Sequence, residues 1–151
     1  MTAAKRKLHF NTFGEVIAEI EKLRAGYTMT SGKWNLEQMC FHLRSPIPQP
    51  LKAVPVEQHP QPNADLVKRF QHYADHDAPL PGITAPPASE PPEIPPADVI
   101  DDLIARLKSA DAFNEPFVDL GPRGPVPVEV YKPFLRGHCA HHLSYLIPTQ
   151  S

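Results

Sequence analysis

Two histidines toward the C-terminal end of the chain have the spacing of a metal-binding pair. His138 and His142 stand four residues apart in the segment HCAHHL. Residues four apart lie on the same face of an α-helix, so both imidazole rings can reach one ion. Neutral imidazole is the commonest side-chain ligand for zinc and related metals. The pair therefore predicts a metal site, and the alternative is two buried histidines that hydrogen bonds alone satisfy.

A third histidine could complete such a site from another helix. His42 lies in the segment WNLEQMCFHL, at the edge of its apolar stripe. In a helical bundle its ring could face His138 and His142. His141 lies beside the C-terminal pair, either as a residue that supports the ligands or as a flanking residue. The remaining histidines fall in tails, in loops or on a polar face, and we interpret them as solvated: His9, His59, His72 and His76.

A site made of His42, His138 and His142 would keep at least one coordination position open, as catalytic metal sites do. Three neutral ligands leave the divalent charge uncompensated, so a bound water could reach a pKa of about 7. The ion could instead hold a thiol as its thiolate. Zinc is the first expectation, and nickel, iron and manganese are alternatives because geometry and supply decide occupancy.

The sequence does not identify a catalytic residue. Glu37 and Glu129 are candidate general bases only because they lie near the histidine motifs, and surface placement is the alternative. Cys40 and Cys139 also lie close to the predicted ligands. They could join the metal, pair with each other as a redox switch, or be ordinary buried thiols.

Apolar residues recur at helical intervals in several segments that would position these side chains. Thr12 with Glu15, and Asn35 with Gln38, have the spacing of a capping box at a helix start. Pro133 is expected at the first position of the last helix, after a separate short turn over residues 128–131. No segment alternates long enough to predict a strand. The predicted helices cover residues 11–25, 35–44, 63–75, 96–110 and 133–146.

Proline divides the chain. Fourteen of its 20 prolines lie between Ser45 and Pro96, so residues 45–96 are expected to form a partly irregular insert between the bundle helices. Whether this insert packs on the bundle or covers the site is left open. The helices on either side predict an all-α fold, with residues 1–151 as a single helical bundle domain.

The segments WNLEQMCFHL and HCAHHLSYL together resemble the DinB/YfiT-like superfamily of metal-binding helical bundles. Within it they resemble an uncharacterised branch, the domain of unknown function 1569. The resemblance implies an up-down-down-up four-helix bundle with a three-histidine centre, whose positions match His42, His138 and His142. Characterised members of that superfamily include metal-dependent transferases that use low-molecular-weight thiols, so the resemblance implies a related activity. Where many of those relatives carry Arg-Gly-Gln, His142 is followed here by Leu-Ser-Tyr.

Composition narrows the classes of partner. The net charge is -2, which gives no reason to expect nucleic acid or an anionic membrane surface. No apolar run approaches the roughly 20 residues that a membrane span needs, and the N-terminal residues do not read as a signal peptide. With two cysteines and no disulfide framework, we expect a reducing cytoplasm. The sequence does not decide whether the chain forms a homodimer.

Two hypotheses about function follow. The first is a metal-dependent transferase or hydrolase acting on a small molecule, with a low-molecular-weight thiol as a candidate substrate. The second is a non-enzymatic binding or stress-response protein with a structural or vestigial metal site. The missing Arg-Gly-Gln motif and the proline-rich insert favour the second.

Overall fold

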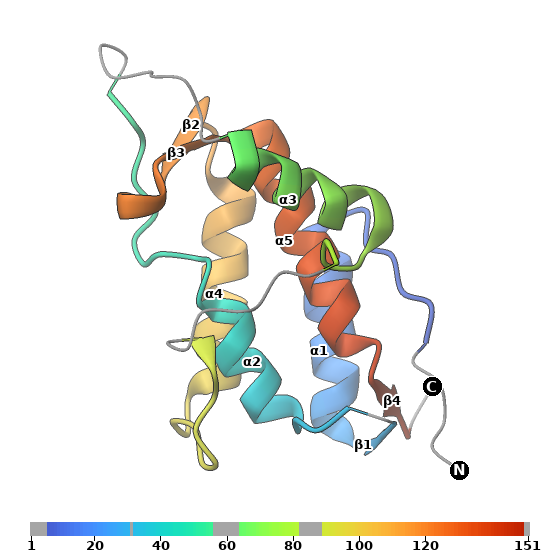
Figure 1. Ribbon diagram of the computed structural model, residues 1–151. Coiled ribbons are helices and arrows are strands. Elements are labelled where there is room, and N and C mark those ends of the chain that lie inside the picture. The colour runs from blue at the N-terminus through green and yellow to red at the C-terminus, as the bar shows by residue number, and fades with distance from the viewer. Residues whose placement is uncertain (1–5, 31, 56–63, 82–88, 150–151) are drawn as a thin grey trace.

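In the computed structural model, the described residues are 6–30, 32–55, 64–81 and 89–149. They form five α-helices, one 3₁₀ turn and four short strands (Figure 1). In chain order these are α1 (Phe13–Ala25), β1 (Tyr27–Met29), α2 (Leu36–Arg44), α3 (Ala64–His76), α4 (Val99–Ala112), β2 (Phe117–Asp119), η3 (Gly121–Arg123), β3 (Pro125–Pro127), α5 (Val128–Leu143) and β4 (Leu146–Pro148). The predicted all-α four-helix bundle is therefore wrong, because the fold is mixed α/β with five helices and two small antiparallel sheets.

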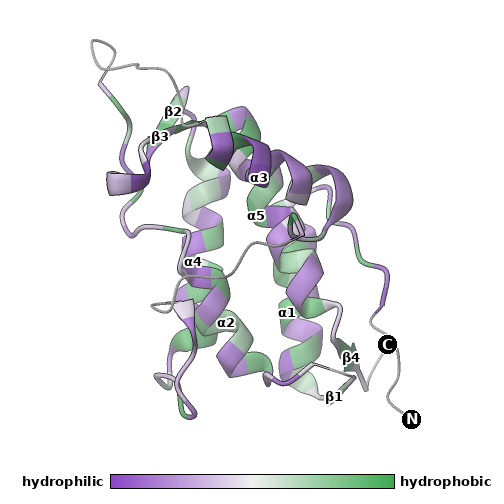
Figure 2. Cartoon of the chain, in the orientation of Figure 1, coloured by the Kyte–Doolittle hydropathy of each residue, from purple (hydrophilic) through white to green (hydrophobic). Residues whose placement is uncertain are grey.

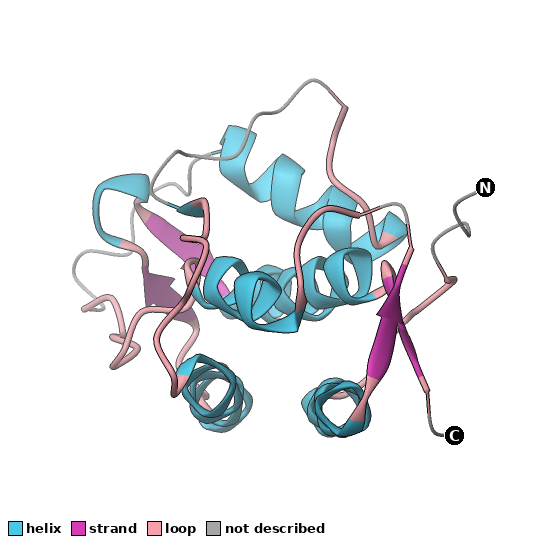
Figure 3. Ribbon diagram, turned by 90° about the horizontal axis from the view of Figure 1, so that it is seen from below, coloured by secondary structure: helices cyan, strands magenta, loops and turns pink. Residues whose placement is uncertain are grey.

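Four of the helices contact one another in a ring, in which α2 and α1 each touch both α4 and α5. The helix α3 packs against α5 from outside this ring (Figures 1 and 3). Aliphatic side chains from all four ring helices are buried between them, which removes their apolar surface from water. They include Val16, Ile20, Leu23, Leu36, Leu43, Leu103, Leu107 and Leu135. None of the described helices is long and apolar enough to cross a membrane.

The two sheets tie together segments that the sequence left as loops or helix. β1 pairs antiparallel with β4, and Tyr27 lies opposite Pro148. β2 pairs antiparallel with β3, and Phe117 lies opposite Pro127. Each strand has three residues, too few to show a period of two, and the partners of β1–β4 lie far apart in the sequence. This is why sequence periodicity did not reveal them.

The starts of α1 and α2 confirm the predicted capping boxes. The Thr12 hydroxyl accepts the backbone N–H of Glu15, and the side chain of Glu15 accepts the backbone N–H of Thr12. Asn35 and Gln38 make the same reciprocal pair of hydrogen bonds at the start of α2. These bonds satisfy backbone donors that have no partner inside the helix. They fix where α2, the helix that carries His42, begins.

The last helix differs from the prediction at Pro133. α5 begins at Val128 and continues through Pro133 without a separate first turn. A proline inside a helix removes one backbone donor, here the one that would reach the carbonyl of Glu129, while the other hydrogen bonds can persist. The helix ends at Leu143, earlier than predicted, because the chain then enters β4.

Candidate metal centre

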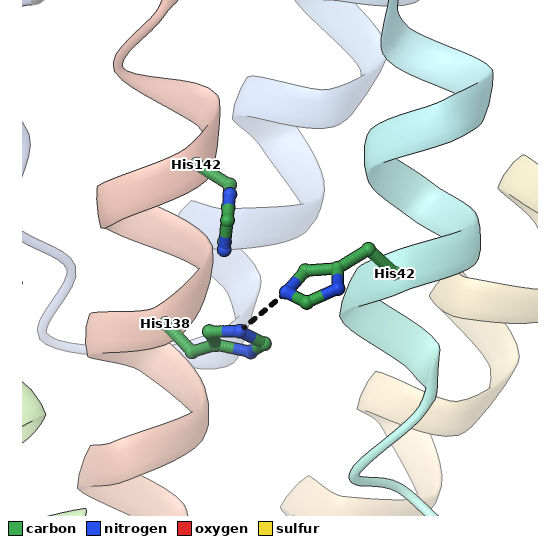
Figure 4. Close-up of side chains that lie close together, drawn as sticks. All are labelled: His42, His138 and His142. Atoms are coloured by element: carbon green, nitrogen blue, oxygen red, sulfur yellow. Dashed lines mark hydrogen bonds between the residues drawn. The ribbon is translucent and has the colours of Figure 1, made fainter. Parts of the chain in front are cut away.

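The structure brings together the three histidines that the sequence singled out. His42 extends from α2, and His138 and His142 extend from successive turns of α5 (Figure 4). Their rings point toward one another, and one ligand atom from each lies within 4.8 Å of the other two. Nε2 of His42 lies 3.1 Å from Nε2 of His138. In a tetrahedral zinc site the ligand nitrogens are about 3.3 Å apart, because each is about 2.0–2.1 Å from the metal.

The orientation of His42 is set by a backbone carbonyl of the proline-rich insert. Nδ1 of His42 lies 3.1 Å from the carbonyl oxygen of Ser89, and both residues are buried. A carbonyl can only accept, so Nδ1 carries the hydrogen and Nε2 presents its lone pair toward His138. Metal-binding histidines usually have their second ring nitrogen held in this way. The sequence did not point to Ser89, because every residue type has the same backbone carbonyl.

Protein hydrogen bonds do not fully satisfy the ring of His138. Its Nδ1 is buried and has no hydrogen-bond partner among the described residues. Because Nε2 of His42 is an acceptor, Nε2 of His138 can pair with it only by donating, which leaves Nδ1 as a buried acceptor without a donor. Such unsatisfied buried groups are rare in folded proteins. An ion that takes a lone pair from this ring would meet part of that need, so the donor set fits a divalent metal.

Burial also selects the protonation state that a metal requires. Loss of solvent lowers the pKa of His42 below its usual 6.5, an effect that the carbonyl of Ser89 and the charge of Glu90 partly oppose. Burial lowers the pKa of His138 much further, and the charges of neighbouring His42, His141 and Arg123 add to this. Both rings are therefore neutral near pH 7, which leaves their lone pairs available for an ion.

Aromatic rings surround the three histidines. Trp34 lies 5.0 Å from the ring of His42 and stacks on His142 at 5.8 Å, measured between ring centroids. Phe134 stacks on His138 at 5.4 Å. His42 and His138 are 5% and 7% exposed, whereas His142 is only partly buried. Solvent therefore reaches the cluster most readily at His142. The rings of His42 and His138 are buried against aromatic side chains.

The close crossing of α3 over α5 depends on Gly137, the neighbour of His138. A Cβ atom added at Gly137 would overlap the carbonyl oxygen of Tyr73 and lie 2.8 Å from its carbonyl carbon. Glycine is the residue that permits such an approach of two backbones. The crossing also places the ring of Tyr73 edge-on to His138, with centroids 5.2 Å apart. Gly137 thus helps to cover the candidate centre.

The other candidates from the sequence are less well placed. Glu37 and Glu129 are both exposed, as the surface alternative expected. No contact among the described residues joins either carboxylate to the three histidines, so nothing in the geometry supports them as general bases. The ring of His141 lies 4.8 Å from that of His142, beside the cluster and outside the group of three converging ligand atoms.

Cys40 and Cys139 are buried free thiols in α2 and α5. Burial, together with the nearby charge of Glu37, raises the pKa of Cys40 to about 12. Burial also raises the pKa of Cys139, and proximity to Cys40 adds to it. The thiolate is the reactive and metal-binding form, so both environments disfavour the chemistry that a redox switch needs. Ordinary buried cysteine is the interpretation that these environments support.

Comparison with known proteins gives one match. A family model described as "Protein of unknown function (DUF1569)" covers residues 2–149, nearly the whole chain. No curated protein and no solved structure matches the chain. The match supports the uncharacterised branch that the sequence motifs suggested, but it carries no link to the DinB/YfiT-like superfamily. That wider relationship stays a prediction.

Proposed function

The chain belongs to this family of proteins of unknown function, and we propose that it is a metal protein whose divalent ion is held by His42, His138 and His142. The observation that carries the proposal is the convergence of three imidazoles from two helices, with ligand atoms within 4.8 Å of one another. Zinc is the first candidate because its sites readily accept nitrogen ligands at this spacing, and nickel, iron and manganese follow.

An ion held by three neutral ligands supplies Lewis-acid chemistry to a small molecule at its open position. The chain itself supplies the environment for this. Burial keeps His42 and His138 unprotonated, and the carbonyl of Ser89 holds the ring of His42 in the ligand orientation. We therefore infer a metal-dependent transferase or hydrolase, with a low-molecular-weight thiol as a candidate substrate. Two buried free thiols are compatible with the reducing cytoplasm that the proposal assumes.

A second candidate is a non-enzymatic protein in which the ion is structural. Two observations favour it: the candidate bases Glu37 and Glu129 are exposed, and His42 and His138 are nearly inaccessible. Metal removal separates the two candidates. A structural ion is coupled to folding, so a chelator should reduce the helical circular-dichroism signal. A catalytic ion should leave that signal unchanged, and added glutathione should alter the absorption spectrum of the cobalt-loaded protein.

Elemental analysis of protein purified without a metal-affinity tag tests the proposal itself. We expect close to one equivalent of a transition metal, or uptake of one equivalent of Zn²⁺ after treatment with a chelator. A content below about a tenth of an equivalent together with no uptake on titration would contradict the proposal. Trp34 is the only tryptophan and stacks on His142, so quenching of its fluorescence by Co²⁺ reports binding at this place.

Substitution of one ligand tests the assignment of residues. His42→Gln should weaken Zn²⁺ binding by more than the roughly 10–100-fold that loss of an outer-shell partner costs, because it removes a direct ligand. His9→Gln is the matched control, since His9 lies outside the cluster in a contact with Asp77. Unchanged affinity in the His42→Gln protein, with its helical signal intact, would show that the three-histidine assignment is wrong.

A further inference from the structure

A second group of histidines lies on α3, away from the candidate centre. His72 and His76 stand four residues apart on this helix, and their ring centroids are 4.5 Å apart. Both border a cavity of about 600 Å³ on the surface of α3, together with Gln71 and Asp75. Figure 2 shows α3 as largely hydrophilic on the side that faces the viewer. The sequence interpretation treated these two histidines as solvated, and their arrangement gives them a more specific role.

A backbone carbonyl also orients one member of this pair. Nδ1 of His72 lies 2.9 Å from the carbonyl oxygen of Ala78, just after the end of α3. As with His42, the carbonyl can only accept, so Nδ1 carries the hydrogen and Nε2 presents a lone pair. The ring of His72 is therefore fixed in a tautomer that can bind a metal. Its orientation does not have to be established when an ion arrives.

An acidic side chain accompanies the pair. Asp75 lies three residues after His72 and borders the same cavity. Its carboxylate accepts a hydrogen bond from the Gln71 amide at 3.1 Å. A negative charge beside the two imidazoles partly compensates the charge of a divalent ion bound between them. The protein donors are thus the two imidazoles of one helix, and the carboxylate of Asp75 borders the same cavity.

We propose that His72 and His76 form a second divalent transition-metal site, in which water completes the coordination. This inference is independent of the proposed function of the central site. With two protein ligands on a solvent-facing helix, the site should bind more weakly than a three-histidine centre. Because nitrogen sites follow the Irving–Williams order, it should prefer Cu²⁺ over Ni²⁺ and Zn²⁺.

The position of this pair gives the site a structural consequence. An ion held by both rings bridges the helical turn between His72 and His76, and that turn contains Tyr73. The carbonyl of Tyr73 packs against Gly137, and its ring packs against His138. Occupancy of the α3 site therefore stabilises the segment that covers the candidate centre, without any ligand being shared between the two sites.

The test is calorimetric titration of the chelator-treated full chain with Ni²⁺. The wild-type protein should bind one equivalent tightly and a second at least about tenfold more weakly, since the second site has fewer ligands. The double variant His72→Gln/His76→Gln should lose only the weaker event and keep the tight one. A weaker event that persists unchanged in the double variant, or no weaker event in wild type, would overturn the inference.

A second measurement does not depend on the central site. A His42→Gln/His138→Gln protein, which lacks two histidines of the central cluster, is titrated with Cu²⁺ and followed by electron paramagnetic resonance. The α3 site predicts one copper signal with nitrogen hyperfine structure, which should disappear when His72→Gln/His76→Gln is added to this protein. The same signal in both proteins would contradict the assignment. If Zn²⁺ does not bind at the centre, the proposed function fails, while loss of the copper signal on addition of His72→Gln/His76→Gln still supports the α3 site.

Discussion

The central cluster of His42, His138 and His142 and the α3 pair of His72 and His76 use the same side chain in different ways. In each group, one ring is held by a backbone carbonyl. The central histidines come from two helices, and His42 and His138 are 96 residues apart in the chain and nearly inaccessible. The α3 histidines come from neighbouring turns of one helix and border a surface cavity. Histidine spacing alone therefore does not distinguish the two; burial and convergence do.

This difference determines how strongly each group should be coupled to folding. The central histidines meet only when α2 and α5 have packed, so the proposed ion would have no preformed site in the unfolded chain. The α3 pair needs only its own helix to form. An ion at the centre should therefore stabilise the whole fold, whereas an ion on α3 should act mainly on that helix.

The largest predicted effect is stabilisation by a central ion. At a free Zn²⁺ concentration 100-fold above its dissociation constant, the free energy of unfolding should rise by about 2.7 kcal/mol. Denaturant titrations with buffered Zn²⁺ and with a chelator measure this difference. The His138→Gln protein should show little of it, and His72→Gln/His76→Gln should retain most of it. Equal stabilisation in both variants would remove the distinction between the two groups.

The next effect concerns the crossing that separates the two groups. Gly137→Ala should lower the free energy of unfolding by about 1–3 kcal/mol, because the new methyl group overlaps the backbone of Tyr73. Gly14→Ala is the matched control. The nearest atom to an added Cβ there is 3.7 Å away, so this helix substitution should be stabilising by about 0.5–1 kcal/mol.

Denaturant titrations of the two glycine variants give the comparison. The Gly137→Ala protein should also show a changed environment for His138, since its contact with Tyr73 depends on the crossing. A shift of the His138 ring signals in nuclear magnetic resonance spectra would report this. If Gly137→Ala is as stable as Gly14→Ala, then α3 does not rest on α5 as described.

The last effect is a dependence of stability on pH in the metal-free protein. Burial lowers the pKa values of His42 and His138 in the folded state, so below about pH 6.5 the unfolded chain binds protons that the folded chain does not. Stability should therefore fall as the pH decreases below this value, by at most about 1.4 kcal/mol per pH unit for each histidine. Denaturant midpoints between pH 7 and 5 measure the slope. His138→Leu should flatten it, and an unchanged slope would contradict the burial argument.

The parts of the molecule that could be predicted from sequence are those governed by local rules. The capping residues Thr12 and Asn35 act on backbone groups within three residues, so their sequence spacing was sufficient. The spacing of His138 and His142 likewise reflects one helix face. The convergence of His42 with them could be proposed because each ligand lay on a stripe that a helix must bury.

The contacts that could not be predicted from the sequence are those that do not depend on the type of side chain. The carbonyls of Ser89 and Ala78 orient His42 and His72, yet any residue provides a carbonyl. The tight packing at Gly137 depends on a helix distant in sequence, so the glycine could have been read as a weak point of α5. The helix α3 was predicted, but its place outside the ring was not. A hydrophobic pattern shows which face of a helix is buried, but it does not show which other element that face packs against.

The long separation between the ligands has a consequence for the protein during its synthesis. At roughly 5–20 residues per second, the ribosome needs about 5–20 seconds to proceed from His42 to His138, which lies 96 residues later. Throughout that interval α2 is exposed without α5, and the first histidine cannot be joined by the others. If the centre binds an ion as proposed, that ion can enter only after most of the chain has been translated.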